Sequence, residues 1–569
     1  MVRNGVLREK TAEPLRAMKI ETLKQQERRG ETAENLSHPT TFTTIRVNRW
    51  LILVWVAVTL FYFSWWLDFS HAGAWFLYGA LFFGEVYHVW QALGYAHTIW
   101  DQKRVAPPKQ HVGFPVDIFI TACNEPKDIV RKTVEAALKI DYPNFKVHIL
   151  NDNYVVKNKD WREIEDLGKE CDVEVITRKI PGGAKAGNIN HALKVTTAPF
   201  FALFDADHVP HRDFLKRTMG YFEDSKIAFV QTPQYYANRN KNFLTQASWE
   251  QQELFFGPLC QGKNRLNATF WCGTNAVMRR EAILGIGGVP ENNIAEDFLA
   301  SLLIHKNGWN SLYIPEILAH GLAPTDAGSY ASQQFRWARG SQEVLFHYNP
   351  LFWKGVTWMQ KMQYLYSAGY YLNGLIVLID ALVPIFVLFT GILPVQDTTG
   401  NFMIYFFPFI FLTLYILIRS TGFTITFRAI QLTMGSFPGF LAATISALIR
   451  KKAFFKVTVK DDEKEEANYL LLALPHIIYI GLAISAIVYA LILQGLVPAV
   501  IANAAWIVFN IVFFSGFIRI AYPWHRVSEK ITRWAKIMVH LTNKKAEILV
   551  PQRVPIEIRD KVEKAEWKP

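Results

Sequence analysis

The chain has 569 residues and a mass of 65.3 kDa, more than one compact core usually accommodates. Hydrophobic residues make up 51% and charged residues only 19%, which excludes a disordered chain and argues against a purely soluble enzyme. The formal net charge is +12. Because the basic residues gather beside apolar segments, we attribute this charge to a membrane surface rather than to nucleic acid binding.

Six segments are long and apolar enough to cross a bilayer, which takes roughly 20 residues per helix. They lie near residues 50–67, 73–95, 368–393, 401–418, 468–494 and 496–518. Lysine and arginine gather before the first segment, between the fourth and fifth, and after the sixth, whereas the turns at 68–73 and 394–400 have neither. This alternation predicts a multi-pass plasma membrane protein whose termini and large central region face the cytoplasm.

Three ionisable residues, Glu85, His88 and Asp380, fall inside these segments. Charge within a membrane is costly. We therefore expect these side chains to face a polar cavity, to pair with one another, or to lie near span ends.

The central region has a different periodicity. Short β-rich runs alternate with helical stretches, with strands predicted at 116–121, 145–151, 173–178, 200–204 and 227–232 and helices at 127–140, 161–171 and 187–195. Such alternation predicts a mostly parallel sheet covered on both faces, with ligands beyond the carboxyl ends of its strands. Four free-standing cysteines, Cys123, Cys171, Cys260 and Cys272, have no zinc or disulfide spacing and indicate a reducing compartment.

The predicted organisation has five parts. A basic leader (1–48) precedes two spans (49–98), an α/β domain (99–350), a membrane region of interfacial helices, four spans and a loop around 451–466 (351–521), and a cytoplasmic tail (522–569).

Asp205 and Asp207 directly follow the apolar strand at 200–204. Two carboxylates at this spacing suit one hard divalent cation, which can bridge the oxygens of a diphosphate and stabilise a departing phosphate. Because aspartate is common in turns, a pair of turn residues is the alternative.

Two further features follow predicted strands. Asp152 ends the strand at 145–151, and it either hydrogen-bonds a base or ribose or is a turn residue. The segment Pro181–Asn188 opens a helix, where glycines let backbone amides approach a phosphate and Lys185 adds a positive charge. It lacks the G-x-x-x-x-G-K-[ST] spacing of a P-loop, so ATP hydrolysis has no support.

Two motifs lie on predicted helices. Glu296 and Asp297 begin a helical pattern, so they either cap that helix or supply a general base for an acceptor hydroxyl. Gln333, Arg336 and Trp337 share one side of another helix. Arg336 suits a phosphate and Trp337 a sugar ring, and the alternative is an amphipathic helix on the membrane surface.

In this order, and flanked by spans, the D, D-x-D, E-D and Q-x-x-R-W motifs resemble the processive family-2 glycosyltransferases of the cellulose synthase and hyaluronan synthase type. The resemblance covers roughly residues 50–520. It implies an α/β GT-A (Rossmann-like) domain inserted into an α-helical transmembrane bundle. It also implies a UDP-sugar donor, Mg²⁺ or Mn²⁺, and an inverting transfer to a growing chain.

The resemblance assigns roles residue by residue. It implies Asp297 as the catalytic base with Glu296 beside it, and Asp205 and Asp207 as metal ligands. It implies donor contacts from Thr121, Glu125, Asp152, Lys185, Asp205, Gln333 and Arg336. It implies acceptor contacts from Trp337, Cys272, Gly273 and Thr274, and a gating loop containing Phe455, Val457, Thr458 and Lys460. Ala295 departs from the threonine that usually precedes the Glu-Asp pair in cellulose synthases, which bears on acceptor placement.

The gating-loop match favours a cellulose-like β-1,4-glucan made from UDP-glucose and translocated across the membrane. The alternatives are a synthase of another β-linked polymer (1,3-glucan, mannan, hyaluronan or chitin type) and a non-processive transferase that glycosylates a lipid. A transporter is disfavoured because the spans show no internal repeat. The partners predicted are the UDP-sugar, the growing polysaccharide and the lipid bilayer, with no nucleic acid; the sequence identifies no periplasmic or extracellular accessory protein.

Overall fold

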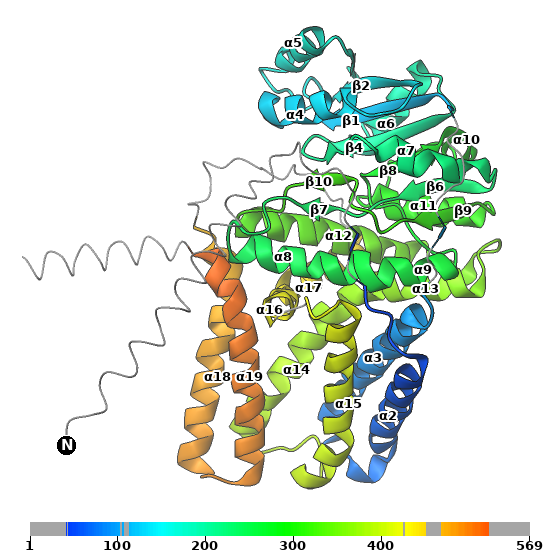
Figure 1. Ribbon diagram of the computed structural model, residues 1–569. Coiled ribbons are helices and arrows are strands. Elements are labelled where there is room, and N and C mark those ends of the chain that lie inside the picture. Colours follow the sequence, from blue (N-terminus) through cyan, green and yellow to red (C-terminus); the bar gives the residue numbers. More distant parts are fainter. Residues whose placement is uncertain are drawn as a thin grey trace, which may run out of the picture.

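The computed structural model describes residues 41–42, 44–102, 105–106, 113–424, 427–450 and 468–522. The predicted gating loop with Phe455, Val457, Thr458 and Lys460 lies outside the described residues, as do positions 1–40 of the leader and 523–569 of the tail. Figure 1 shows a sheet domain above a layer of helices, with long helices below.

The upper domain is built on a seven-stranded sheet of order β3-β2-β1-β4-β8-β6-β9. Its strands are β1 (Val116–Ala122), β2 (Phe145–Asn151), β3 (Glu174–Thr177), β4 (Phe200–Asp205), β6 (Ile227–Gln231), β8 (Ala276–Arg279) and β9 (Asn310–Tyr313). Strands β1 to β4 run parallel, so the predicted parallel sheet is confirmed there. Strand β8, which the sequence pattern did not predict, is antiparallel to β4 and β6.

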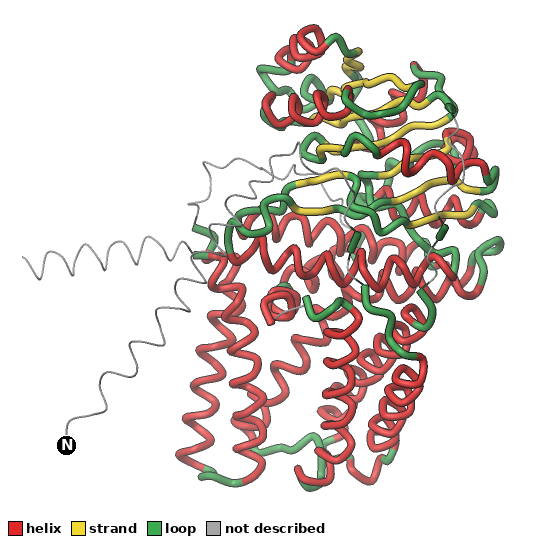
Figure 2. The backbone as a smooth tube through the Cα atoms, in the orientation of Figure 1, coloured by secondary structure: helices red, strands yellow, loops and turns green. Residues whose placement is uncertain are grey.

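Helices cover both faces of this sheet (Figure 2). On one face α4 (Lys127–Leu138), α5 (Arg162–Cys171) and α7 (Phe214–Thr218) contribute to an apolar core with β1 and β2. On the other face lie α6 (Ala184–Val195), α10 (Arg280–Gly285) and α11 (Glu296–Lys306). Strand β4 is buried up to its last residue because both of its faces are covered, which explains its continuous apolar run.

The register aligns the carboxyl ends of the central strands. Thr121 of β1 pairs with Asp205 of β4, and Ala122 pairs with Asn151 of β2. A second, three-stranded sheet lies beside this edge and contains β5 (Val209–Pro210), β7 (Tyr235–Tyr236) and β10 (Ala319–Gly321). The polar residues that follow β1, β2 and β4 therefore meet at one edge.

The middle layer joins the sheet domain to the long helices. It contains α8 (Phe243–Leu254), a π-helical turn at Phe255–Leu259, α9 (Cys260–Arg265), α12 (Ala327–His347) and α13 (Trp358–Gly369), with α16 (Phe427–Gly435) and α17 (Phe437–Leu448). The buried side chain of Arg339 fixes α12 to α17, because its Nε donates to the Ser446 hydroxyl at 3.0 Å.

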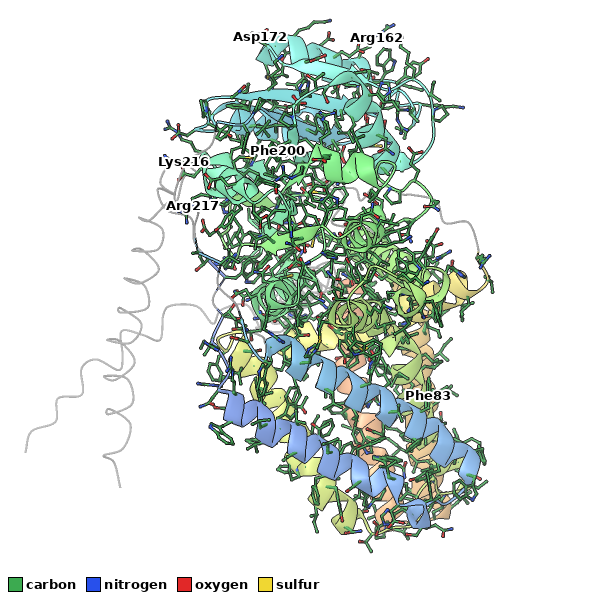
Figure 3. The ribbon with its side chains drawn as sticks, turned by 90° about the vertical axis from the view of Figure 1, so that its right-hand side faces the viewer. Phe83, Arg162, Asp172, Phe200, Lys216 and Arg217 are labelled. Carbon is green, nitrogen blue, oxygen red and sulfur yellow. The ribbon has the colours of Figure 1, made fainter. Side chains whose placement is uncertain are left out.

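Five helical segments are long and apolar enough to cross a membrane. They are Arg49–Leu67, Trp358–Thr390, Thr399–Ser420, Leu470–Leu493 and Pro498–Ala521, which contain α2 (Arg49–Leu67), α14 (Asn373–Thr390), α15 (Thr399–Ser420), α18 (Leu474–Leu493) and α19 (Pro498–Ala521). The prediction of six spans is not confirmed. The segment predicted at 73–95 does form a helix, α3 (Trp75–Ile99), beside α2 (Figure 3), but Glu85, His88 and Gln91 dilute its apolar character.

The three ionisable residues predicted within the spans pair with one another. His88 Nδ1 lies 3.6 Å from Glu85 Oε2, and His88 Nε2 lies 3.7 Å from Asp380 Oδ2. This contact joins α3 to α14. Gly84 leaves the space for it, because a Cβ at that position would lie 3.2 Å from Asp380 Oδ1.

Candidate active site

The candidate site lies at the carboxyl edge of the parallel strands. Asp205, the last residue of β4, accepts hydrogen bonds from Lys185 Nζ and, at 3.3 Å, from Thr121 Oγ1. The Thr274 hydroxyl accepts a hydrogen bond from the Asp205 backbone amide at 3.0 Å. Three separate chain segments therefore hold the first aspartate of the D-x-D motif.

Lys185 is placed by the turn that begins α6. Gly182 and Gly183 have φ values of 136° and 66°, which a residue with a side chain rarely adopts, and Lys185 follows in the first turn. Its Nζ also donates to the Gly273 carbonyl at 2.8 Å. Burial opposes the charge on Lys185, but the carboxylates of Asp205 and Glu296 outweigh it and raise its pKa.

Gly273 separates the lysine from the predicted base. A Cβ on Gly273 would lie 3.0 Å from Asp297 Oδ2 and 3.7 Å from Lys185 Nζ, and its φ of 79° favours glycine. Gln231 fixes this loop by accepting from the Cys272 amide at 2.8 Å and donating to the Thr274 carbonyl at 2.9 Å. Because residue 273 has no side chain, Lys185 and Asp297 can both lie close to it.

Glu296 and Asp297 begin α11, as the sequence predicts. Burial raises the pKa of Asp297, and the neighbouring Glu296 carboxylate raises it further. Burial also raises the pKa of Glu296, which Lys185 partly offsets. An aspartate with a raised pKa is a stronger base when ionised, which suits it to accept a proton from a hydroxyl group.

The Q-x-x-R-W residues lie on α12. Arg336 interacts electrostatically with Glu296, Asp205 and Asp297, so the structure brings it to the same cluster, and burial lowers its pKa. Gln333 hydrogen-bonds to Tyr236. Trp337 is half-buried, and among the described residues no aromatic ring stacks on it.

Asp152 and Glu125 form a neighbouring group at the same edge. The Asp152 carboxylate is held by the Arg178 guanidinium, with Nε to Oδ1 at 2.9 Å and Nη2 to Oδ2 at 2.7 Å. Both side chains are buried, and burial raises the pKa of Asp152 although Arg178 opposes this. Glu125 accepts a hydrogen bond from the Cys123 amide. Arg178 also connects this group to the turn that carries Lys185, because its Nη2 donates to the Ala184 carbonyl at 3.1 Å and its Nη1 donates to the Gly182 carbonyl.

The D-x-D segment offers hard oxygen ligands. Asp207 accepts from the Leu322 amide at 3.1 Å through Oδ2, and His208 Nδ1 lies 3.6 Å from Asp207 Oδ1 and 4.0 Å from Asp205 Oδ2. Neither ring nitrogen of the buried His208 has a hydrogen-bond partner in the described part of the chain. No set of three His, Cys, Asp or Glu side chains is assembled for a metal among the described residues. Two carboxylates fit a divalent ion whose other ligands come from a diphosphate.

Four contributors to this edge were not predicted. Arg178 is the last residue of the predicted strand at 173–178, and its position at a strand end could have marked it as a site residue. His208 directly follows the D-x-D motif. Gln231 and Gly340 carried no local signal. Gly340 lets α12 approach α11, because a Cβ there would lie only 2.4 Å from the Ala295 Cβ. Ala295, the predicted departure, is therefore in close contact with α12.

Two family models match the chain. Residues 114–340 match a model described as "Glycosyltransferase like family 2", and residues 286–526 match one described as "Cellulose synthase". Together they span the sheet domain and most of the long helices.

Curated relatives agree with these matches. The chain is 32% identical over 473 residues to the cellulose synthase catalytic subunit of Pseudomonas fluorescens, covering 79% of this chain and 62% of that protein. It is 36% identical over 292 residues to the catalytic subunit of Xanthomonas axonopodis pv. citri, covering 50% of this chain and 39% of that protein. The chain thus spans less than two thirds of the length of these relatives.

A solved mannosyltransferase from Pyrobaculum calidifontis, in complex with GDP-Man and Mn²⁺, resembles the chain with a TM-score of 0.44 and 16% identity, covering 71% of this chain and 100% of that one. The two family models, the mixed sheet and the relatives above 30% identity lead to one assignment. Residues 114–340 carry a glycosyltransferase family 2 domain, residues 286–526 carry a cellulose synthase domain, and the chain is similar to the catalytic subunits of cellulose synthases.

Proposed function

We propose that the protein is a membrane-embedded, processive, inverting glycosyltransferase that polymerises a cellulose-like β-1,4-glucan from UDP-glucose and passes it across the membrane. The observation that supports this most is one cluster of charged side chains, in which Lys185 lies between Asp205 and the Gly273 loop beside Asp297, and Arg336 interacts electrostatically with both aspartates. The names of the relatives, "Cellulose synthase catalytic subunit [UDP-forming]", support the donor and the product.

In this proposal Asp297 takes the proton from the acceptor hydroxyl as that oxygen attacks the anomeric carbon of the donor. The C–O bond to UDP breaks on the opposite face, which inverts the configuration. Lys185 and Arg336 stabilise the negative charge on the departing diphosphate. Glu296 keeps the base region negative and so favours proton uptake by Asp297.

Asp205 and Asp207 would hold Mg²⁺ or Mn²⁺, which supplies charge neutralisation for the diphosphate when bound. Thr121 fixes Asp205 for this role. The paired Asp152 and Arg178, with Glu125, are proposed to receive the nucleoside, since a buried carboxylate with a fixed orientation can accept hydrogen bonds from a base or ribose.

Trp337 is proposed to stack on an acceptor sugar, and Cys272, Gly273 and Thr274 to shape the acceptor end. Thr274 is buried and binds the Asp205 backbone, so its proposed contribution is to the shape of the site. Gln333 would act near the donor through Tyr236. The proposed domain organisation and cytoplasmic termini are those given by the charge pattern of the loops.

The test is incubation of purified protein in lipid nanodiscs with a panel of UDP-sugars and either Mg²⁺ or Mn²⁺. We expect UDP release with UDP-glucose, and a long product with 1,4 linkages by methylation analysis. A polymer of another sugar or linkage would identify another β-glycan synthase. A single sugar added to a lipid would replace processive synthesis with lipid glycosylation.

A further inference from the structure

A cavity of about 370 Å³ lies where the end of the leader meets the middle layer. The residues that line this cavity, the Arg46 cavity, are Thr44 and Arg46 of the leader, Gln102 after α3, and Gln261 of α9. All four side chains are polar, and none belongs to the candidate active site. The volume falls within the range of about 300–1,000 Å³ that is typical of small-molecule sites.

The walls of the Arg46 cavity are fixed to one another. Gln261 is 5% exposed, and its Nε2 donates to Thr44 Oγ1 at 2.6 Å, which joins the leader to α9. Helix α9 in turn packs closely on α3, because a Cβ on Gly262 would lie only 2.2 Å from the Thr98 carbonyl oxygen. The cavity is therefore enclosed by elements that contact one another directly.

Positive charge is in excess beside the cavity. Asp101 binds two arginines, with Arg46 Nη2 at 2.8 Å from its Oδ1 and Arg49 Nη2 at 2.8 Å from its Oδ2. A third arginine, Arg265 of α9, interacts electrostatically with Asp101 and Arg49. Three guanidinium groups and one carboxylate leave a net charge of +2, and both oxygens of that carboxylate already accept hydrogen bonds.

The same place has buried hydrogen-bond donors without acceptors. Gln102 Nε2 and Arg265 Nε are both buried, and neither has a hydrogen-bond partner in the part of the chain that the structure describes. Arg265 Nη2, in contrast, donates to the His97 carbonyl at 2.9 Å. Buried N–H groups usually have an acceptor, and where the chain supplies none the acceptor is ordered water or a ligand.

An excess of N–H donors and of positive charge suits an anion with several oxygen atoms. Arginine is particularly suited to phosphate, since its guanidinium presents several donors in a fixed plane. We propose that the Arg46 cavity binds the phosphate group of a phosphate ester, with Arg46, Gln102 and Thr44 donating to its oxygens. A phosphate bound there would connect the leader to α3 and α9.

Two sources present this chemistry. One is a soluble phosphate ester, for which the volume of the cavity leaves room beyond the phosphate itself. The other is the headgroup of an anionic phospholipid, because the cavity lies at the ends of α2 and α3 that are nearest the sheet domain (Figure 1). The binding does not depend on sugar transfer in either case.

The first measurement is equilibrium dialysis of the full chain in detergent with radiolabelled glycerol 3-phosphate, at an ionic strength held constant with potassium chloride. We expect saturable binding that Arg46→Gln and Gln102→Met each weaken by at least about tenfold, since each removes a hydrogen bond to a charged ligand. Arg131→Gln is the matched control, because Arg131 is also paired with a carboxylate, that of Glu170, but lies on α4. This control should bind as the wild type does.

Gln102→Met separates binding from folding. Because the wild-type Nε2 is buried without a partner, an apolar side chain of similar size should leave the thermal midpoint without ligand unchanged or raise it. A loss of phosphate binding at an unchanged midpoint therefore reports the site itself.

The second measurement is native mass spectrometry of the same proteins after incubation with phosphatidylglycerol or with diacylglycerol, which lacks the phosphate. Retention of phosphatidylglycerol that both variants lose, without binding of glycerol 3-phosphate, would identify the lipid headgroup as the source. Binding of glycerol 3-phosphate that both variants lose would identify a soluble ester. Binding of neither probe, or equal binding by the wild type and both variants, would overturn the site. Neither readout uses UDP release, so an inactive enzyme does not affect them.

Discussion

At the scale of single residues, the raised pKa of Asp297 is the feature with the clearest kinetic consequence. The proposed base must be ionised to accept a proton, and burial together with Glu296 raises its pKa above the ordinary aspartate value of about 3.9. The enzyme form with a protonated Asp297 therefore persists to a higher pH than usual.

We expect the acidic limb of the pH profile of kcat/KM to lie well above pH 4, and Asp297→Asn to lower the rate of UDP release by about 10²- to 10⁴-fold, the usual contribution of a general base. Initial rates at saturating metal across the pH range measure both. Asp166→Asn, at an exposed position on α5, is the control and leaves the profile unchanged. An acidic limb near pH 4 would show that another group is the base.

The pair formed by Asp152 and Arg178 is a buried ion pair with two hydrogen bonds. Removing one partner of such a pair leaves an uncompensated charge, which costs about 3–5 kcal/mol. Arg178→Gln is therefore expected to lower the thermal midpoint strongly and to weaken UDP binding. Thermal unfolding with and without UDP measures both effects. Arg162→Gln, an exposed arginine on the same domain (Figure 3), is expected to change neither; equal midpoints for the two variants would contradict the argument.

At the scale of elements, the contact between α12 and the start of α11 places Arg336 beside Asp297. It depends on Gly340, where a Cβ would lie 2.4 Å from the Ala295 Cβ and 2.6 Å from the Ala295 backbone nitrogen. An added methyl group forces the two helices apart, because backbone atoms cannot yield as a flexible side chain does.

Gly340→Ala is therefore expected to reduce the rate of transfer by at least about tenfold, since misplacement of a positioned group by about 1 Å can cost 10²-fold. Gly439→Ala on α17 is the control, because nothing lies within 4 Å of a Cβ there. Rates of UDP release and thermal midpoints of both variants test this. Full activity of Gly340→Ala would mean that the spacing of α11 and α12 does not govern the reaction.

Helix α9 carries a buried amine that no carboxylate pairs with in the described part of the chain. Lys263 Nζ donates to Gln363 Oε1 at 3.0 Å and to the Ser367 hydroxyl at 2.9 Å. Burial lowers its pKa to about 8, whereas an unfolded lysine titrates near 10.4. At a pH between these two pKa values, Lys263 is therefore more fully protonated in the unfolded chain than in the folded chain.

The contribution of Lys263 to the free energy of unfolding is therefore expected to rise with pH from about 8 to 10 and to be constant below pH 8. Comparing the thermal midpoints of the wild type and of Lys263→Met across this pH range isolates the contribution of Lys263, because the variant should lack the increase in stability with pH. Lys169→Met serves as the control: the Lys169 side chain is 76% exposed, and this variant should keep the increase in stability with pH. An identical rise in Lys263→Met would assign the effect to another group.

Among the elements, those that local residue types determine could be predicted from the sequence. Strands with continuous apolar runs, such as β4, and the helix opened by Gly182 and Gly183 were predictable because local residue types determine them. Strand β8 was not, because its four residues pair antiparallel with strands that lie far away in the sequence. The approach of Gly340 to Ala295 is a tertiary contact with no local signal, although the residues that it brings together were predicted.

At the scale of the whole molecule, the two turns at the lower end of the bundle lie side by side. The Gly73 amide donates to the Pro394 carbonyl at 3.0 Å, and Ala72 forms a bridge with Val395. Both turns lack lysine and arginine and lie at the end of the bundle opposite the sheet domain (Figure 1). The charge pattern and the arrangement of helices thus predict the same outer side for these turns.

Ser70→Cys is expected to react with a membrane-impermeant maleimide added to intact cells, because Ser70 is exposed in the first of these turns. Lys157→Cys, exposed on the sheet domain, is expected to react only after the cells are opened. The wild-type chain provides the background, since its four cysteines lie in the sheet domain and the middle layer and should stay unlabelled from outside. Labelling of Lys157→Cys in intact cells would reverse the orientation. Because the donor UDP-sugar is made inside the cell, that outcome would also separate the active site from its proposed substrate.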